Sequence, residues 1–511
     1  MTSKSKKNIF ISNALLLSFV NIIMRGISVS FNAFVNNKIG SESMGLFTLV
    51  MSVYSFALTV ALSCVNLGAV RLTSERCAQL ENCDELSWKY ALKHVMRSVC
   101  LYGLLFGSAA GFLLFSVSGM ISQYLLKDTR TLISLKLLAL SLPMISLSSA
   151  VSGYFTGLRK VSKNAIAAVS EQFFKIIVTS TALAMIHPGN VEFACTAVVG
   201  GAALSEAWSL ICNIFMYITD TGKPAGIIFG NEQKRLHTRF SDVAEISLPA
   251  AIGAYARQGL STLEHLAIPE GLRKFGLPSN KALSSYGLLQ GIAFPLVMFP
   301  YAVIGSFTSL LIPEISEKHA LDDKTGIMQL TEKVYRYSAC FSVCACGIFV
   351  NFAEERGVMI YNSSEAAAYT LFLGLLVPFM YLDTAVEALL KGLGEQLYVM
   401  KINIIDSAGG LLLVIFLTPV MGIWGYIAAV WICEIGNLAA SIYKLGRITD
   451  AGISLSICCH FKPILCAVAA SVINTIMTGI IPTYIAVAFF AVIYIVLYVI
   501  TEKKLVKGFH S

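Results

Sequence analysis

Apolar residues run in long stretches along the whole chain, and short polar or Pro/Gly-containing breaks separate these stretches. Each stretch has roughly 18 to 27 residues, and a helix of that length crosses a hydrocarbon core about 30 Å thick. The pattern therefore predicts fourteen membrane-spanning helices whose ends are set by the breaks. The expected spans are residues 10–35, 44–68, 95–120, 132–157, 164–187, 192–218, 242–268, 284–312, 335–353, 366–390, 398–418, 421–443, 461–481 and 483–500.

Composition supports a chain that folds in lipid. Apolar residues make up 56% of the 511 residues, charged residues make up only 13%, and the mean hydropathy is +0.72. An ordinary soluble domain has about 25% charged residues, and its core could not enclose this much apolar surface. No small-x-small cleavage site follows the first apolar stretch, so we expect that stretch to be retained as the first span. The predicted fold class is an all-α, polytopic membrane protein.

The distribution of positive charge predicts the orientation of the spans. With the N-terminus placed in the cytoplasm, the inside segments hold 25 Lys or Arg residues and the outside loops hold 7. Such a positive-inside bias predicts that both termini lie on the cytoplasmic side of the membrane. The net charge of +8 then reflects topology and the lipid surface. We expect a monomer that contacts membrane lipids and binds no nucleic acid.

The chain also matches itself at two constant offsets, which predicts a duplicated architecture. The recurring positions are Gly45-Leu46 and Ser74-Glu75 at an offset of 242 (Gly287-Leu288, Ser316-Glu317), and Ala150-Val151, Gly157-Leu158 and Glu171 at an offset of 235 (Ala385-Val386, Gly392-Leu393, Asp406). We predict an N-lobe over residues 1–219 with spans 1–6, a cytoplasmic linker over 220–241, and a C-lobe over 242–446 with spans 7–12. Spans 13 and 14 and a tail occupy 447–511. The two lobes are expected to form a V around a central cavity.

Ionisable residues inside the predicted spans are candidate functional positions, because such a group near the bilayer centre costs about 2.5–3.5 kcal/mol on insertion scales. Glu171 and Lys175 lie four residues apart in span 5 and can pair along one helix. Ion coupling and interhelical bonding are both open interpretations for these groups. The set comprises Glu171, Lys175, Glu206, Asp383, Glu387, Asp406 and Glu434.

Two arginines are the candidate substrate-binding groups. Arg25 and Arg257 each lie near the middle of the first helix of a predicted lobe, and neither has an acid three or four residues away in the sequence. Guanidinium groups bind phosphate bidentately, so arginines facing a cleft favour an anionic substrate. The alternative is that helix carbonyls or a distant acid such as Glu206 satisfy them.

Spans 7 and 8 contain residues that interrupt helices, namely Pro249, Gly253, Pro295 and Pro300. Such residues permit a membrane helix to bend, although Gly and Pro are also common in ordinary membrane helices. We favour bending in both spans.

Other chemistries lack their sequence motifs. The chain has no phosphate-binding Gly-rich loop, no zinc-protease motif, and no loop longer than about 26 residues that would hold an ATPase domain. Most of the thirteen cysteines lie in apolar stretches without disulfide-module spacing. The group Cys340, Cys344 and Cys346 has no histidine nearby. We therefore expect no metal, no cofactor and no enzymatic activity, and an ion gradient, the membrane potential or the substrate gradient supplies the energy.

Several short segments resemble the polysaccharide flippase branch of the multidrug/oligosaccharidyl-lipid/polysaccharide (MOP) exporter superfamily, including its lipid II flippases of sporulation. They are KIG at 38–40, MGL at 44–46, AVRLTSE at 69–75, GLR at 157–159 and LIPEISE at 311–317. The resemblance runs over nearly the whole chain. It implies export of an undecaprenyl-pyrophosphate-linked saccharide by alternating access, with a peptidoglycan precursor for the spore cortex as one such substrate. It also implies that Arg25 contacts the pyrophosphate.

The chain departs from this pattern in span 7. Related sporulation proteins have an acid there, followed by Ile-Pro and two arginines. Glu264 and Ile268-Pro269 fit this pattern, but Glu270-Gly271 replaces the arginine pair. Glu264 therefore joins the candidate substrate-binding residues, while the outer rim of the cavity differs from the pattern.

Two other functions remain alternatives. A multidrug or organic-cation antiporter of the same superfamily commonly has twelve spans and an acid in the first helix, whereas this chain has fourteen predicted spans and Arg25. A membrane glycosyltransferase or polymerase would need a large extracytoplasmic loop, and the longest predicted one, 269–283, is short. The flippase interpretation is the leading hypothesis.

Overall fold

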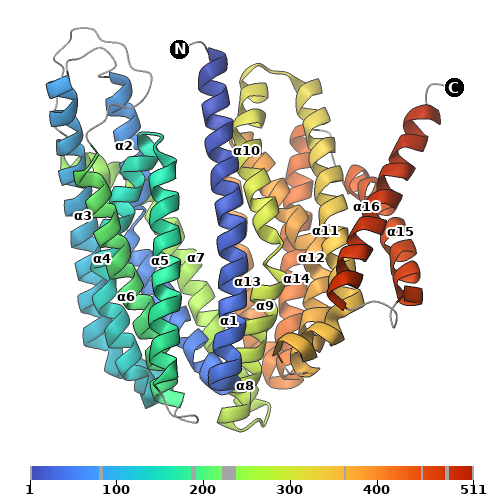
Figure 1. Ribbon diagram of the computed structural model, residues 1–511, viewed down its shortest axis with the longest axis horizontal. Helices are drawn as coiled ribbons and strands as arrows, with labels where there is room; N and C mark the ends of the chain where they lie inside the picture. Colours follow the sequence, from blue (N-terminus) through green and yellow to red (C-terminus); the bar gives the residue numbers. More distant parts are fainter. Residues whose placement is uncertain are drawn as a thin grey trace. The chain divides into compact units, whose positions relative to one another are not determined.

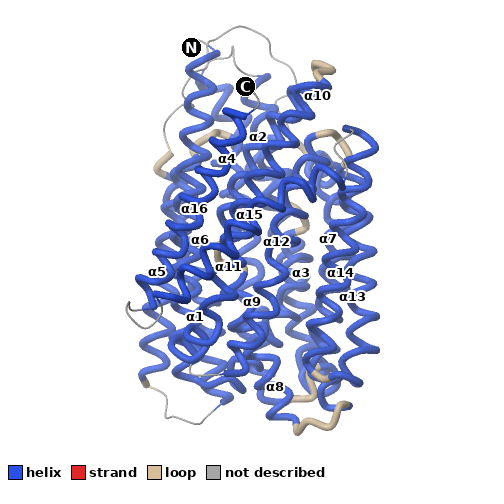
Figure 2. The backbone as a smooth tube through the Cα atoms, turned by 90° about the vertical axis from the view of Figure 1, so that its right-hand side faces the viewer, coloured by secondary structure: helices blue, strands red, loops and turns tan. Residues whose placement is uncertain are grey.

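The computed structural model describes residues 3–79, 85–185, 191–220, 238–361, 364–449, 453–477 and 483–508. Throughout these ranges the chain is helical, with connecting turns and no β-strand (Figure 2). Most of the predicted linker 220–241 lies outside the described residues. The predicted all-α class is confirmed.

The helices follow one another in the order labelled in Figure 1. They are α1 (Ser3–Leu62), α2 (Val65–Gln79), α3 (Glu85–Met120), the π-helical turn η1 (Ile121–Leu125), the 3₁₀ turn η2 (Thr129–Thr131), α4 (Leu132–Gly157), α5 (Val161–Ala184), α6 (Val191–Ile218), α7 (Phe240–Lys274), α8 (Ser279–Leu288), the π-helical turn η3 (Leu289–Ala293), α9 (Phe294–Val297), α10 (Tyr301–Ala320), α11 (Lys324–Tyr361), α12 (Ser364–Gly392), α13 (Gln396–Met421), α14 (Ile423–Thr449), α15 (Ile453–Met477) and α16 (Thr483–Gly508).

Helix α1 contains two predicted spans. Its backbone leaves the helical region at Gly40, with φ 82° and ψ 163°, a conformation that glycine adopts without steric cost. Sixty residues of helix would extend about 90 Å, which is far more than the roughly 30 Å of a hydrocarbon core. The two parts of α1 therefore form separate crossings. With α2 counted as the continuation of the second part of α1, and α8 to α10 counted as one crossing, the described helices correspond in order to the fourteen predicted spans.

Most helices extend beyond the predicted spans. Helix α11 covers Lys324–Tyr361, for example, where the hydropathy pattern indicates only 335–353. The pattern reports the length in contact with hydrocarbon, whereas a helix continues until a turn or cap ends it. Within the described residues, nine segments are long and apolar enough to cross a membrane by themselves. Apolar side chains such as Phe112 remain exposed on their surfaces, as expected for helices in contact with lipid.

The second span of each half of the chain is interrupted. Between α1 and α2, Ser63 and Cys64 adopt positive φ values of 40° and 54°. Between α9 and α10, the span breaks at residues 298–300 after the π-helical turn η3. A buried tyrosine closes each break: Tyr102 donates to the carbonyl of Ser63 at 3.0 Å, and Tyr381 donates to the carbonyl of Val297 at 2.9 Å.

The residues that can interrupt a helix have different effects in spans 7 and 8. Helix α7 continues through Pro249 without a break, because neighbouring helices can support a proline in a membrane helix. Span 8, in contrast, is divided at Pro300, which precedes α10. Flexible bending in either span stays a prediction.

The chain divides into two compact units, Met1–Pro269 and Glu270–Ser511. The division falls within α7, later in the chain than the predicted boundary at 219–242. Most of α7 packs on the first unit, where Thr262 donates to the carbonyl of Ser52 at 3.0 Å and Tyr255 hydrogen-bonds Ser63. The predicted lobe boundaries and the V around a central cavity stay predictions.

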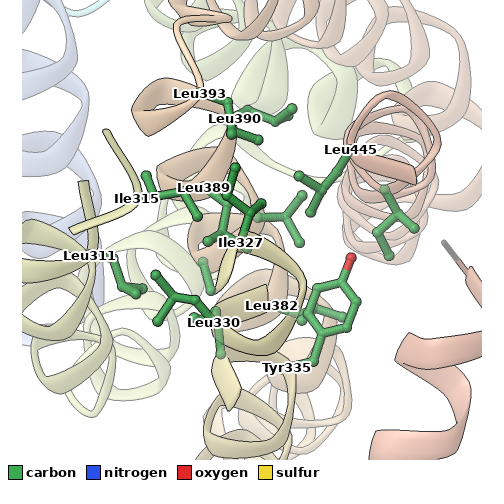
Figure 3. Packing of buried hydrophobic residues seen from close by; sticks show 14 of the residues in the cluster. Leu311, Ile315, Ile327, Leu330, Tyr335, Leu382, Leu389, Leu390, Leu393 and Leu445 are labelled. Carbon is green, nitrogen blue, oxygen red and sulfur yellow. The ribbon is translucent and has the colours of Figure 1, made fainter. Parts of the chain in front are cut away.

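Each unit has its own apolar core. In the first unit, α2, α3 and α4 enclose Val65, Val99, Tyr102 and Phe155, all fully buried. In the second unit, α10, α11, α12 and α14 contribute to one cluster, and Figure 3 shows Ile315, Leu389 and Leu445 within it. Ordinary packing of leucine and isoleucine therefore holds the helices that carry the polar residues described below.

Spans 13 and 14 pack on α11. Phe490 and Tyr494 of α16 are fully buried against it, and the Tyr494 hydroxyl donates to the carbonyl of Cys340 at 2.8 Å. Cys340 and Cys344 belong to this apolar contact. The cysteine group is therefore part of helix packing, in agreement with its apolar sequence context.

The internal repeat is visible in the turns that follow α4 and α12. Lys160 donates its backbone N–H to the carbonyl of Phe155, and Glu395, 235 residues later, donates to Leu390; both distances are 2.9 Å. Arg159 and Gly394, again 235 residues apart, both have positive φ, at 60° and 85°. These bonds close the helix end in the manner of a Schellman motif. The offset found in the sequence therefore relates equivalent positions in the two units.

Candidate functional site

The candidate substrate-binding residues lie on two helices of the first unit. Arg25 lies in the first part of α1 and is half-buried, and it makes a polar or electrostatic contact there. Arg257 is exposed on α7, and it has no hydrogen bond or ion pair to any residue that the structure describes. Glu264, two turns further along α7, is half-buried and has a contact of its own. Of these three residues, Arg257 therefore has a guanidinium group that can contact a substrate.

A charged cluster connects α5 and α6 in the first unit. Lys175 interacts electrostatically with Glu206 and, more weakly, with Glu171. All three side chains are half-buried. Tyr54 of α1 lies close enough to interact with both acids, and its hydroxyl hydrogen-bonds Ser141 at 3.0 Å. The lysine therefore faces two acids on two helices and is not confined to the predicted contact along α5.

A neutral network continues from this cluster. Asn213 of α6 donates to the hydroxyl of Ser148 on α4 at 2.8 Å, and Ser148 in turn bonds Ser209 at 3.2 Å. Ser209 reaches the carboxyl group of Glu171. A chain of polar side chains thus runs from α4 through α6 to α5 inside the first unit.

The second unit contains a more acidic cluster on α12, α13 and α14. Asn437 donates to Asp383 at 3.0 Å and lies 3.4 Å from the side-chain oxygen of Asn403. Asn403 donates to Glu387 at 2.7 Å, and Lys391 donates to the other oxygen of Glu387, also at 2.7 Å. Two asparagines therefore connect two carboxylates on α12 through the neighbouring helices.

Two further acids adjoin this network. Glu434 interacts electrostatically with Asp383, Asp406 and Glu387. Asp383 is only 7% exposed, yet its second oxygen has no hydrogen-bond partner among the described residues. The side-chain oxygen of Asn437 also has no partner among the described residues, as is true of Asn213 in the first unit, whereas the fully buried hydroxyl of Ser441 faces Asp383 and can donate to it. Negative charge exceeds positive charge at this point, because four acids share the neighbourhood of Lys391.

The two clusters occupy equivalent positions in the repeat. At the offset of 235, Ser148 corresponds to Asp383 and Glu171 corresponds to Asp406. At an offset of 224, Asn213 corresponds to Asn437, so one asparagine makes the same interhelical bond in both units. Sequence reasoning missed both asparagines because uncharged residues do not stand out in an apolar span. The self-comparison, extended into the sixth span of each half, would have found them.

A transition-metal or calcium site is not formed by these residues. No group of three or more His, Cys, Asp or Glu side chains within the described ranges is arranged to hold a metal ion. The cluster of the second unit instead places the carboxylate of Asp383 beside the side chains of Asn437 and Ser441, with three further acids near it, and such oxygens suit a hard cation.

Two curated proteins of Bacillus subtilis (strain 168) are similar in sequence. The chain is 25% identical to stage V sporulation protein B over 439 residues, which covers 83% of this chain and 81% of that protein. It is 20% identical to sporulation protein YkvU over 391 residues, covering 76% and 83% of the two chains.

Solved structures share the fold. The lipid II flippase MurJ, in an inward closed conformation, superposes with a TM-score of 0.70 and 13% identity, covering 98% of this chain and 100% of its own. An inward-facing multidrug resistance MATE family transporter of the MOP superfamily superposes with a TM-score of 0.64 and 12% identity, covering 86% and 97%. At this identity the comparison establishes architecture alone.

The family assignment comes from a sequence match that spans more than half of the chain. The model of the polysaccharide biosynthesis protein family matches residues 10–319. This match confirms the polysaccharide biosynthesis part of the resemblance stated from the motifs, and the solved structures confirm the expected architecture. The chain belongs to the polysaccharide biosynthesis protein family and has the multi-pass helical membrane fold of these solved structures.

Proposed function

We propose that the protein moves an undecaprenyl-pyrophosphate-linked saccharide across the bacterial plasma membrane by alternating access. The observation that carries this proposal is the share of the chain that each solved structure matches. The lipid II flippase structure matches 98% of the chain, whereas the MATE transporter leaves about a seventh of it without a counterpart. A transporter of small soluble cations has no evident use for the additional length.

The chemistry of the candidate residues fits a pyrophosphate group. Arg25 lies inside a membrane span, and Arg257 lies exposed on α7. A guanidinium group inside a membrane span is costly unless it binds a partner. It can bind two oxygens of a phosphate group at once. In this proposal Arg25 and Arg257 receive the pyrophosphate, and Glu264 contributes to the same site.

Sporulation is the proposed setting, with lipid II as the first substrate to test. Two relatives carry sporulation in their names, and the structural relative is a flippase for lipid II. The positive-inside distribution supports cytoplasmic termini for a monomeric transporter. Lipid II is exposed to enzymes outside the cell only after it is flipped, so such a transporter would supply peptidoglycan synthesis.

The acidic cluster of the second unit supports coupling to a cation. Asp383 has an acceptor oxygen without a donor among the described residues, and Glu434 and Asp406 add negative charge beside it. A singly charged cation or a proton would satisfy these oxygens and offset the charge. In this proposal its binding favours one of the two states of the transport cycle. Asp383→Asn should then abolish the cation dependence of flipping while leaving substrate binding in place.

A multidrug or organic-cation antiporter is the alternative function. The MATE transporter fold favours it, and the four acids of the second unit would suit a cationic substrate. The arginine in span 1 argues against it, because a fixed positive charge repels such a substrate.

Binding measurements separate the two functions. Purified protein in liposomes is titrated with lipid II, with an undecaprenyl-pyrophosphate oligosaccharide and with a cationic dye. We expect lipid binding without dye binding, and Arg25→Ala should weaken the lipid affinity about ten-fold or more, equivalent to about 1.4 kcal/mol. Arg25→Lys keeps the charge but loses the bidentate fork, and it is the matched control. Its lipid affinity should lie between that of the wild type and that of Arg25→Ala. Dye binding that is indifferent to Arg25 would favour the antiporter.

A further inference from the structure

Helix α7 lies antiparallel along the interrupted span 2. Tyr255 hydrogen-bonds Ser63 at the break between α1 and α2, and Thr262, further along α7, donates to the carbonyl of Ser52 at 3.0 Å. The residue number thus rises along α7 while that of its partner in span 2 falls. Two hydroxyl groups of α7 therefore bond span 2 at two separate heights.

Glycines bring the two helices close together between and beside these bonds. A Cβ atom at Gly259 of α7 would lie 3.4 Å from the ring of Phe56, and one at Gly68 of α2 would lie 2.4 Å from the hydroxyl oxygen of Ser247. Val243, near the start of α7, is fully buried in the core of the first unit. The same side of α7 therefore packs on span 2 over most of its length.

The bond of Tyr255 depends on the break in span 2. Ser63 donates its own hydroxyl hydrogen to the carbonyl of Val60, so Tyr255 is the donor in the bond between the two hydroxyl groups. Ser63 and Cys64 both have positive φ, a conformation that is unfavourable for a residue with a Cβ atom. Tyr102 and Tyr255 thus both donate to Ser63 where the backbone is strained.

The rotation of α7 decides where the candidate substrate-binding residues point. Successive residues of a helix are about 100° apart around its axis. Arg257 and Glu264 therefore lie on the side roughly opposite the one on which Tyr255, Gly259 and Thr262 meet span 2. In agreement with this placement, Arg257 is exposed. A rotation of α7 by one residue position would turn this guanidinium group by about 100°.

We propose that Tyr255 and Thr262 are positioning residues of the substrate site, because their bonds to span 2 fix the rotation of α7 that presents Arg257 and Glu264 on the side turned away from that span. This inference rests on the proposed function, in which Arg257 and Glu264 belong to the pyrophosphate site. Neither hydroxyl group contacts the substrate in this proposal. Each acts through the orientation of the helix.

The test measures the affinity of the purified protein for lipid II in liposomes. Tyr255→Phe and Thr262→Val should each weaken the affinity by about 2- to 10-fold, the range expected for the loss of one hydrogen bond. The same changes are then made in Arg257→Ala/Glu264→Gln, which lacks both charges. There they should alter the affinity by less than about two-fold, because residues that act through the same groups are not additive.

Three further variants serve as controls. Ser63→Ala removes the same bond as Tyr255→Phe, so it should weaken lipid II binding to the same degree, and the two changes together should do no more than either alone. Tyr443→Phe and Thr181→Val should bind as the wild type does. Tyr443 is 59% exposed on α14, and the exposed Thr181 bonds only carbonyl groups of its own helix.

The outcomes separate this inference from the proposed function. If Tyr255→Phe and Thr262→Val lower the unfolding temperature but leave the affinity for lipid II unchanged, the two hydroxyl groups only stabilise the fold and the inference is wrong. An equal loss of affinity in Arg257→Ala/Glu264→Gln would also overturn it. If the wild type binds no lipid II, or if Arg257→Ala/Glu264→Gln binds it as tightly as the wild type, the proposed site is wrong and the inference falls with it. Should Tyr255→Phe fail to fold, Ser63→Ala is judged by the same criteria.

Discussion

The hydroxyl of Ser316 donates a hydrogen bond to the carbonyl of Gly392 at 2.9 Å. Ser74 makes the same bond to Gly157 at 3.3 Å in the other unit. The two serines are related by the offset of 242 and the two glycines by the offset of 235. Residues that recur at two different offsets therefore contact each other, and the same contact is present in both halves of the chain.

Close packing accompanies this contact and gives a first prediction. A Cβ atom at Gly392 would collide with Ile315, and one at Gly157 would lie 2.7 Å from Thr73. Gly392→Ala and Gly157→Ala should each destabilise the protein by about 1–3 kcal/mol through overpacking. Thermal unfolding in detergent measures the loss. Gly436→Ala is the control, because a Cβ atom there meets no heavy atom within 4 Å. Equal stability of all three variants would contradict close packing as the reason for glycine.

The turns after α4 and α12 give a second prediction, since they hold different residues in one conformation. Gly394 has φ 85° without steric cost, whereas Arg159 has φ 60° at a cost of about 1–2 kcal/mol. Gly394→Ala should therefore lower the unfolding free energy by about 1 kcal/mol, while Arg159→Gly should leave it unchanged or slightly raised. Urea titration of both variants tests this. A loss of stability in Arg159→Gly as large as that in Gly394→Ala would show that the arginine side chain matters more than its backbone.

Ion pairs of opposite polarity occupy equivalent places beside these turns. Lys160 pairs with Asp220 at 2.7 Å in the first unit, and Glu395 pairs with Lys444 at 2.8 Å in the second. Asp220 is 7% exposed and also binds Lys163, whereas Lys444 and Glu395 are 28% and 35% exposed. Burial decides the strength of such pairs, because removing one partner of a buried pair strands the other charge.

This difference gives a third prediction. Asp220→Asn should cost about 1.5–3 kcal/mol, because its buried carboxylate accepts hydrogen bonds from two lysines, and Lys444→Met should cost no more than about 1 kcal/mol. Unfolding of both variants at low and high salt is the measurement. Salt should weaken the effect of the Lys444 change and leave that of Asp220 nearly intact. The reverse order of stabilities would rule out burial as the deciding factor.

The interrupted eighth span gives a fourth prediction. The hydroxyl of Tyr381 satisfies the carbonyl of Val297 where the helix breaks. Tyr381→Phe leaves that carbonyl without a donor in an apolar interior, so we expect a loss of about 1–3 kcal/mol. Tyr337→Phe is a matched control, because Tyr337 is 62% exposed. If the two variants unfold alike, water or another group satisfies the carbonyl.

The sequence predicted the membrane crossings well because lipid leaves few alternatives. A helix is the only structure that satisfies its own backbone in a single crossing, so apolar length alone located the fourteen spans. Span 8 was predicted as one segment, whereas the structure divides it at residues 298–300, because apolar length does not show a break within a span. The offset of 235 was also readable, since helices of equal length and order conserve the spacing of turn residues such as Gly157 and Gly392.

The partners of the charges could not be read in the same way. Lys175 was expected to contact Glu171 along α5, but Glu206 on α6 interacts with it more strongly. Which residues of two helices face one another depends on the rotation of each helix, and this is set by packing throughout the unit. The bonds of Asn437 to Asp383 and Asn403 depend on the placement of three helices. Such contacts become predictable only when the repeat supplies a second example, as Asn213 does here.

The last two spans give the fifth prediction. Gly347 of α11 faces the ring of Phe490 on α16, where a Cβ atom would lie 2.5 Å from the ring. Gly347→Leu should therefore displace α16 from α11. If spans 13 and 14 serve a lipid-linked substrate, this variant should lose lipid II binding by about ten-fold or more. The soluble pyrophosphate headgroup, tested alone, should bind as it does to the wild type.

A second substitution separates this effect from general unfolding. Phe490→Ala creates space beside residue 347, and the new leucine can fill part of it. The double variant Gly347→Leu/Phe490→Ala should therefore be more stable than the sum of the single changes predicts, by about 0.5–3 kcal/mol, and it should regain part of the lipid affinity. Additive losses would place the two residues out of contact. Lipid binding that survives the displacement of α16 would mean that spans 13 and 14 are not needed to bind the lipid-linked substrate.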